Sequence, residues 1–238
     1  MDKYLNHLAR NGYSTNTIST YKSVLQIYRN HLKDIRNVKA ILKSKFNSPN
    51  TVWTHYNVLV SYFEFINDKR IKQLKEIKLP RVPMKFLNVF KKQYLFIKTN
   101  ISPNDSSETI NKKMLIRFLF ETGIRVSEIK SIISYNKKTM VIKGKGNKIR
   151  EIFHNYDTTS LISDFNFTSK TIRIYVKEVL GKKYTPHSIR RSFATHLLLR
   201  GANPKMVMLQ LGHSKVETTF RYLQLSLEQN KKIYDKYF

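Results

Sequence analysis

Apolar positions near the start of the chain recur at the steps of an α-helix. They are separated by three or four residues, so that one face of a helix would carry all of them. Ser14 or Thr15 is suited to cap the first turn of that helix, because a hydroxyl can accept a hydrogen bond from an exposed N–H group. The apolar residues of this series are Ile18, Tyr21, Leu25, Tyr28 and Leu32.

A second helical series predicts a helix over residues 50–66, with Asn50 or Thr51 as its cap. Its apolar stripe consists of Trp53, Tyr56, Val60 and Phe63. Residues 1–80 are therefore expected to form an all-helical domain. Pro80 and Pro83 then interrupt the helical pattern, and this makes residues 81–87 the expected linker to a second domain over 88–238.

The pattern changes period in the second half. A helix is expected over residues 107–122 through Ile110, Met114, Phe118 and Leu119, and Gly123 is suited to end it. Residues 139–153 instead read as a β-hairpin, TMVIK and IREIF around the turn GKGNK. The fold class predicted is mainly α with a small sheet of two or three strands.

Caps and stops mark the helices that follow. Thr185 with Pro186 begins one that Gly201 ends, and Asn203 with Pro204 begins another that Gly212 ends. Ser-x-x-acid or Ser-x-x-Gln capping boxes predict two more helices. The two boxes are Ser214 with Glu217, and Ser226 with Gln229, which opens a final helix to Phe238.

The composition indicates a polyanionic partner. Lys and Arg number 44 against 16 acidic residues, for a net charge of +28. The excess is spread over the chain: residues 1–80 carry 14 basic and 5 acidic side chains, and residues 81–238 carry 30 and 11. Nucleic acid and an acidic membrane surface are the two partners to weigh. Helices that alternate aromatic stripes with charges disfavour the membrane, which needs a broad apolar face.

Cysteine is absent, which excludes disulfides and cysteine-ligated zinc. The N-terminus has no apolar signal core, and the sequence has no run of about 18 apolar residues. We therefore expect a soluble, cytoplasmic protein, with nucleic acid as the first partner to consider.

Six polar residues of the second half have the chemistry for attack on a phosphodiester. Two arginines can hold the nonbridging oxygens, where negative charge gathers in the transition state. A lysine on a hairpin can protonate the leaving 5′ oxygen, and a tyrosine can attack if its surroundings are strongly positive. The set consists of Arg125, Lys145, His187, Arg190, His213 and Tyr222.

These residues are placed near element ends. His187 and Arg190 share a face near a helix N-terminus, where the dipole favours an anion. Arg125 follows the Gly123 stop, and His213 precedes the Ser214 cap. No cluster of Asp and Glu is available to bind magnesium, so we expect neither a metal nor another cofactor.

The order and spacing of the set resemble the tyrosine recombinase, or phage integrase, family, and most of all its Xer-like site-specific recombinases. The matching motifs are TGIRVSE (122–128), GKGNK (144–148), H-x-x-R at 187–190, and L-G-H at 211–213 followed nine residues later by Tyr222. The resemblance covers roughly residues 88–238, and residues 1–80 resemble the family's helical core-binding domain.

The resemblance implies a mechanism and an assembly. Tyr222 would attack the scissile phosphate to form a 3′-phosphotyrosine and free a 5′ hydroxyl, without ATP or metal. Glu128 would support the fold around Arg125. Two domains would enclose duplex DNA, and four protomers would act on two DNA sites. The C-terminal helix, 226–238, would dock on a neighbouring protomer, although packing on its own domain is the simpler alternative.

Several alternatives stay open on the sequence. Lys143 or Lys148 could replace Lys145 as the hairpin lysine. His196 reads as a core residue, and the basic run over 129–150, which includes Arg150, reads as a surface that follows phosphates. Two other functions also fit these residues. A type IB topoisomerase would use the same kinds of catalytic residue, and a non-catalytic relative would only bind DNA.

Overall fold

The computed structural model describes residues 1–83, 89–220, 231 and 234–235. It divides the chain into two compact units, Met1–Met84 and Lys85–Phe238, and each is considered by itself. No helix in the described part of the chain has the length and apolar character needed to cross a bilayer.

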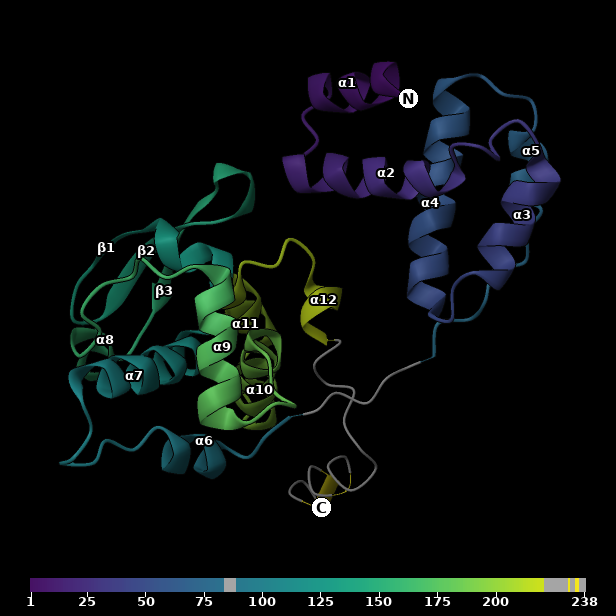
Figure 1. Cartoon of the computed structure of the whole chain (residues 1–238). Coiled ribbons are helices and arrows are strands. Elements are labelled where there is room, and N and C mark those ends of the chain that lie inside the picture. The colour runs from purple at the N-terminus through teal and green to yellow at the C-terminus, as the bar shows by residue number, and fades with distance from the viewer. Residues whose placement is uncertain (84–88, 221–230, 232–233, 236–238) are drawn as a thin grey trace. The chain divides into compact units, whose positions relative to one another are not determined.

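The first unit is helical, with each helix contributing to one apolar core (Figure 1). Ser14 caps α2 by accepting a hydrogen bond from the Thr17 amide at 3.2 Å, as the sequence predicts. Tyr28 at the end of α2 is fully buried and lies 3.2 Å, Oη to Nδ1, from the buried ring of His55 on α4. The helices are α1 (Asp2–Arg10), α2 (Thr15–Tyr28), α3 (Ile35–Ser44), α4 (Pro49–Phe65) and α5 (Ile71–Lys75).

The start of α4 differs from the prediction. Its N-cap is Ser48, and Pro49 is the first helical residue, so the predicted caps at Asn50 and Thr51 lie inside the helix. Proline is favoured at that position because its missing N–H would have no helical partner there. Trp53 also departs from the predicted core stripe: it is 39% exposed, and its indole N–H donates to the Pro80 carbonyl at 3.0 Å.

The second unit is mainly helical with one three-stranded antiparallel sheet in the order β1-β2-β3, so the predicted fold class is confirmed. Its helices are α6 (Lys92–Lys98), α7 (Ser107–Thr122), α8 (Tyr156–Ser160), α9 (Ser169–Leu180), α10 (Pro186–Leu199), α11 (Pro204–Leu211) and α12 (Val216–Phe220). The strands are β1 (Ile132–Tyr135), β2 (Thr139–Lys143) and β3 (Ile149–Phe153), with 3₁₀ turns η1 (Val126–Ser131) and η2 (Lys145–Asn147).

The sheet has one buried face. Met140 and Ile142 of β2 and Ile152 of β3 are buried in the unit's core. In the register of β2 and β3, Met140 lies opposite Ile152 and Ile142 lies opposite Arg150. An arginine thus occupies a core-facing position of the sheet beside the residues of the candidate site.

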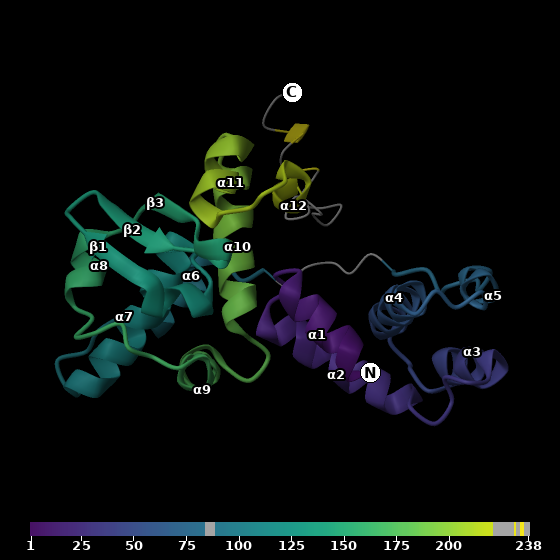
Figure 2. The ribbon, with the colours of Figure 1, turned by 90° about the horizontal axis from the view of Figure 1, so that it is seen from above.

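Helix α10 runs through the second unit and packs against α7, α9 and α11 (Figures 1 and 2). Helix α7 ends at Gly123, which has a left-handed φ of 65° and is the predicted stop. The ring of Phe193 from α10 and a methyl of Leu211 from α11 lie so close to Gly123 that a Cβ would collide with both. This close packing brings the end of α7 next to α10 and to the end of α11.

Candidate active site

Four of the six predicted site residues line one cavity in the second unit. Arg125, His187, Arg190 and His213 come from segments up to 88 residues apart, and they surround a space of about 560 Å³. Arg173 of α9 and the start of α10 at Thr185 and Pro186 complete its polar rim. No Asp or Glu of the described residues lines it. The cavity is therefore suited to an anion.

Arg125 is held by its neighbour Glu128 in η1. Its amide donates to Glu128 Oε2 at 2.8 Å and its Nη1 donates to Oε1 at 2.9 Å, while Nη2 donates to the Gly212 carbonyl at 3.2 Å. Glu128 is 3% exposed. Burial raises the pKa of this carboxyl, but the hydrogen bonds from Arg150 and the Arg125 amide outweigh it and hold the pKa below its usual range. An ionised carboxylate is thus kept beneath Arg125.

Arg190 is 5% exposed and is fixed by backbone carbonyls of two separate loops. Nη1 donates to the Gly123 carbonyl and Nη2 to the Leu211 carbonyl, both at 2.6 Å. A buried guanidinium held by carbonyls at two helix ends is preorganised, because little of its geometry changes when an anion arrives. The close packing around Gly123 therefore serves to place this arginine.

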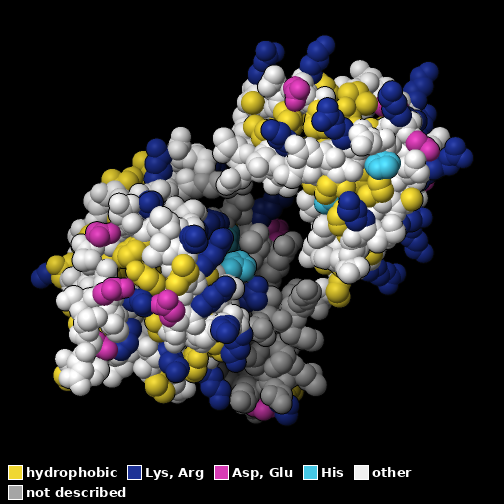
Figure 3. All heavy atoms as spheres, in the orientation of Figure 1, with side chains coloured by type: hydrophobic (Ala, Val, Ile, Leu, Met, Phe, Trp, Pro, Cys, Tyr) yellow, Lys and Arg dark blue, Asp and Glu magenta, His cyan; other side chains and the backbone are white. Residues whose placement is uncertain are grey.

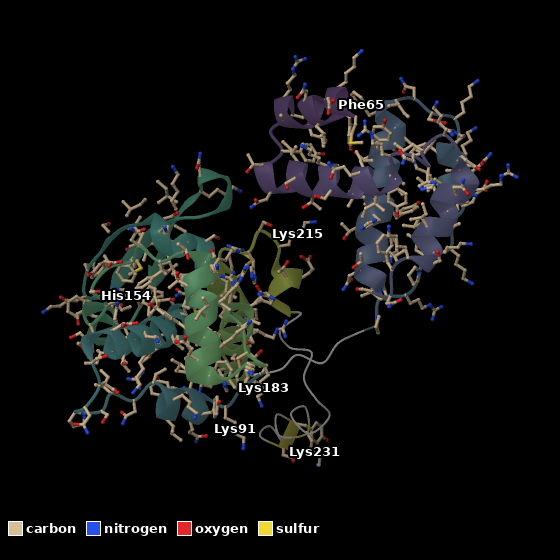
Figure 4. The ribbon with its side chains drawn as sticks, in the orientation of Figure 1. Phe65, Lys91, His154, Lys183, Lys215 and Lys231 are labelled. Atoms are coloured by element: carbon tan, nitrogen blue, oxygen red, sulfur yellow. The ribbon has the colours of Figure 1, made fainter. Side chains whose placement is uncertain are left out.

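His213 follows Gly212, the left-handed residue that ends α11. Its Nε2 lies 3.1 Å from Arg190 Nη2, and its Nδ1 lies 2.9 Å from Thr219 Oγ1. Because arginine can only donate, Nε2 accepts, and the ring proton is on Nδ1. Burial and the charges of Arg190, Arg125 and Arg150 lower the pKa of His213 to about 4. Lys215, two residues later, marks this loop between α11 and α12 in Figure 4.

His187 lies at the second position of α10, behind Thr185 and Pro186. Thr185 Oγ1 accepts from the Ser188 amide at 3.2 Å, and Ser188 Oγ accepts from the Thr185 amide at 2.9 Å, which closes a capping box. Partial loss of solvent around its ring, and the charges of Arg191 and Arg190, lower the pKa of His187. The imidazole is neutral at pH 7 and can accept a proton.

The structure does not describe the side chains of two predicted site residues, Tyr222 and Lys145. Tyr222 is outside the described residues, as is the predicted final helix apart from Lys231, Tyr234 and Asp235. Lys145 belongs to η2 in the turn between β2 and β3, but its side chain lies outside what the structure describes. The alternative lysines, Lys143 and Lys148, are both exposed on either side of this turn.

Other residues of the site differ from the sequence analysis or were missed by it. Arg173 lines the cavity. No motif in the sequence distinguishes it from any other arginine on the solvent side of a helix. Arg150, predicted to follow phosphates, instead donates to both oxygens of Glu128 at 2.8 and 2.9 Å. His196 packs against Phe120, and its Nε2 lies 2.8 Å from the Phe90 carbonyl, which agrees with the core role expected.

Lys and Arg side chains gather around histidines on the face of the second unit shown in Figure 3. Charged groups of one sign around a cavity raise the local concentration of a polyanion. The second unit thus offers a preorganised set of cations and neutral imidazoles whose chemistry fits a phosphodiester.

Comparisons with known proteins point in the same direction. The model of the phage integrase family matches residues 163–229, the segment that includes His187, Arg190, His213 and Tyr222. The tyrosine recombinase XerC of Staphylococcus epidermidis is 27% identical over 97% of this chain and 93% of its own length. The tyrosine recombinase XerA of Pyrococcus furiosus is 26% identical over 99% of this chain and 93% of its own.

Solved structures share the fold. The XerH site-specific recombinase, bound to palindromic difH substrate in a post-cleavage complex, superimposes with a TM-score of 0.69 at 19% identity. The match covers 95% of this chain and 81% of that one. A lambda integrase dimer bound to a COC′ core site gives a TM-score of 0.70 at 15% identity, with 93% of each chain covered.

Proposed function

We propose that this chain, as a Xer-like tyrosine recombinase of the phage integrase family, cuts and rejoins duplex DNA at specific sites through a 3′-phosphotyrosine intermediate. The observation that carries the proposal is the convergence of Arg125, His187, Arg190 and His213 on one cavity without an acidic lining residue among those described. DNA is the partner that its relatives' complexes indicate.

In the proposed reaction the phenolic oxygen of Tyr222 bonds to phosphorus, and the bond from phosphorus to the 5′ oxygen breaks. Arg125 and Arg190 stabilise the negative charge on the two nonbridging oxygens. The phenolic proton passes to a neutral imidazole, and His187 is the exposed one. Lys145 delivers a proton to the departing 5′ oxygen. Rejoining reverses these transfers with a 5′ hydroxyl from the partner strand.

The roles of His213 and Glu128 follow from their contacts. His213 accepts from Arg190 through Nε2, so it orients that guanidinium and, once protonated, can donate to a phosphate oxygen. Glu128 is buried beneath Arg125 and supports it. Arg173, at the rim of the cavity, is suited to a neighbouring phosphate of the same strand.

The proposal includes the assembly. Strand exchange between two duplexes needs two cleaved sites held together, and we propose a tetramer with the segment 226–238 contacting a neighbouring protomer. We also propose that the protein acts on its DNA in the cytoplasm. The residues 1–80 would supply the second DNA-binding surface, with 14 basic side chains against 5 acidic ones.

A type IB topoisomerase is not favoured, because the relatives and solved structures that the chain matches are recombinases and integrases. The two activities differ in their products. A topoisomerase relaxes supercoiled plasmid as a monomer without sequence preference, whereas a recombinase joins strands from two separate sites. A non-catalytic relative would give neither product.

The test is strand capture from a library of nicked duplexes. A nick near the cleavage site lets the short fragment that carries the freed 5′ hydroxyl diffuse away. The protein then stays covalently attached, and the captured strands can be sequenced. We expect captured strands that share one sequence, and strand transfer between two copies of it. Tyr222→Phe should form no adduct, while the matched control Tyr156→Phe, at an exposed tyrosine of α8, should form it at the wild-type rate.

Relaxation of supercoiled plasmid without any sequence shared by the captured strands would contradict the recombinase proposal. Binding without an adduct on any duplex would contradict catalysis altogether.

A further inference from the structure

Arg150 is a basic residue inside the second unit, and its surroundings differ from those of the lysines beside it in sequence. Its side chain is 16% exposed, whereas Lys143 and Lys148 are exposed. It lies opposite Ile142, on the face of the sheet that packs into the core. A residue in this place is poorly situated to reach a DNA backbone.

The guanidinium of Arg150 binds the same Glu128 carboxylate that holds Arg125. Nη1 and Nη2 donate to Oε1 and Oε2 at 2.8 and 2.9 Å, a parallel two-bond pair. Oε1 accepts from Arg125 Nη1 as well. A single buried carboxylate is therefore shared by two arginines, and the orientation that Glu128 offers to Arg125 is set by Arg150.

The Arg150 guanidinium occupies space that is open only because two neighbouring residues, both glycines, have no Cβ. A Cβ on Gly212 would lie 2.6 Å from Arg150 Cζ, and a Cβ on Gly144 would lie 2.8 Å from its Nη1. Gly212 precedes His213 and its carbonyl accepts from Arg125. Gly144 precedes Lys145 in the hairpin turn. The guanidinium thus touches the backbone next to two of the predicted site residues and shares a carboxylate with a third.

We propose that Arg150 is a positioning residue, which fixes Arg125, His213 and the turn bearing Lys145 through its pair with Glu128 and its packing against Gly144 and Gly212, without binding DNA phosphate itself. The proposal rests on the proposed function, since it assumes that these three residues act on the phosphate. It predicts that the shape of the arginine fork matters, because lysine keeps the charge but cannot make two parallel hydrogen bonds.

The test compares Arg150→Lys and Arg150→Gln with Lys138→Gln, which removes one positive charge from the exposed turn between β1 and β2. On a captured nicked duplex we expect both Arg150 variants to form the adduct at least about tenfold more slowly, since losing one anion-stabilising donor outright costs about 10²–10³ in rate. Their DNA affinity and its salt dependence should change no more than in Lys138→Gln.

Coupling to Glu128 gives a second readout. Arg150→Gln combined with Glu128→Gln should slow the adduct by much less than the product of the two single effects, because both act through one pair. Wild-type cleavage by Arg150→Lys, or independent effects of the two substitutions, would overturn the proposal. So would a loss of affinity and salt dependence at an unchanged cleavage rate.

A measurement on the unmodified protein tests the proposal even if the Arg150 variants fail to fold. In arginine side-chain NMR, the Nη protons of Arg150 should be protected from exchange, and their shifts should be unchanged when duplex DNA is added. A large shift on DNA binding would show a direct phosphate contact and refute the inference. If the unmodified protein forms no adduct on any duplex, the proposed function fails, and this NMR result still decides whether Arg150 is internal.

Discussion

Arg190 is a charge that the protein buries and satisfies with its own backbone. The Gly123 and Leu211 carbonyls each accept from it at 2.6 Å, so the guanidinium closes the gap between the end of α7 and the end of α11. Removing it would leave two carbonyls without this donor. The same side chain thus contributes to stability and, in the proposed reaction, to catalysis.

Arg190→Lys keeps the positive charge but cannot reach both carbonyls. We expect adduct formation to fall by about 10²–10³, equivalent to about 3–4 kcal/mol in the barrier. The free energy of unfolding should fall by about 1–3 kcal/mol, because a buried acceptor loses its partner. Urea unfolding and captured-strand kinetics measure the two effects. Arg200→Lys, at the exposed C-terminal end of the same helix, is the control, and equal behaviour of both variants would contradict this role.

His213 provides a test of pH dependence. Its folded-state pKa of about 4 lies below the ordinary 6.5, so the folded protein disfavours the ring proton. The corresponding stability is fully present above pH 6.5 and is lost as the pH falls toward 4. A phosphate beside Arg190 and Arg125 offsets the charges that lower this pKa, so DNA should raise it and bind with uptake of a proton.

Histidine NMR titration, with the resonance assigned through His213→Gln, measures this pKa with and without duplex DNA. We expect a value near 4 in the free protein and a higher one in the complex. A free-protein pKa at or above 6.5 would contradict the buried, Arg190-bonded ring.

At the scale of elements, much of the second unit could be predicted because its signals are local. Helix α7 ends at Gly123 and the hairpin spans 139–153 as expected, since a left-handed glycine and a period of two act within a few residues. The N-cap of α4 was misplaced by two or three residues, because Pro49 as the first helical residue makes Ser48 the cap. The signal for this cap is also local, because proline is favoured at the first helical position, and the sequence alone could have located it.

The pairing of Arg150 with Glu128 could not be predicted, because it joins residues 22 apart and depends on the register of β2 and β3. In the sequence Arg150 is one basic residue of a run, and nothing local separates a buried arginine from a solvated one. The convergence of Arg125, Arg190 and His213 could be proposed only from motif order. Arg173 carried no motif and was missed.

Alanine substitutions at two glycines would separate the cost of backbone strain from the cost of overpacking. Gly123 and Gly201 have φ of 65° and 88°, but only Gly123 has side chains where a Cβ would lie. Gly201→Ala should therefore cost about 1 kcal/mol of unfolding free energy from strain. Gly123→Ala should cost about 1–3 kcal/mol more, because the Cβ overpacks against Phe193 and Leu211.

Denaturant titration of both alanine variants measures this difference. Equal losses in the two proteins would contradict the close packing at the end of α7, on which the placement of Arg190 depends.

At the scale of the whole molecule, a net charge of +28 spread over both units governs encounter with DNA. A protein that neutralises 6–10 phosphates loses about 10³–10⁵ in affinity between 50 and 200 mM salt. We expect this protein to lose at least about 10³ for a captured site, as measured by fluorescence anisotropy. A change below about tenfold would show that few of these charges contact the DNA.

The proposed function depends on one tyrosine that carries the DNA covalently. Its most direct test is to digest the trapped adduct and identify by mass spectrometry the peptide and residue that bear the 3′-phosphate. We expect attachment at Tyr222 through a phosphotyrosine bond. Attachment at any other side chain, or linkage to a 5′ phosphate, would contradict it.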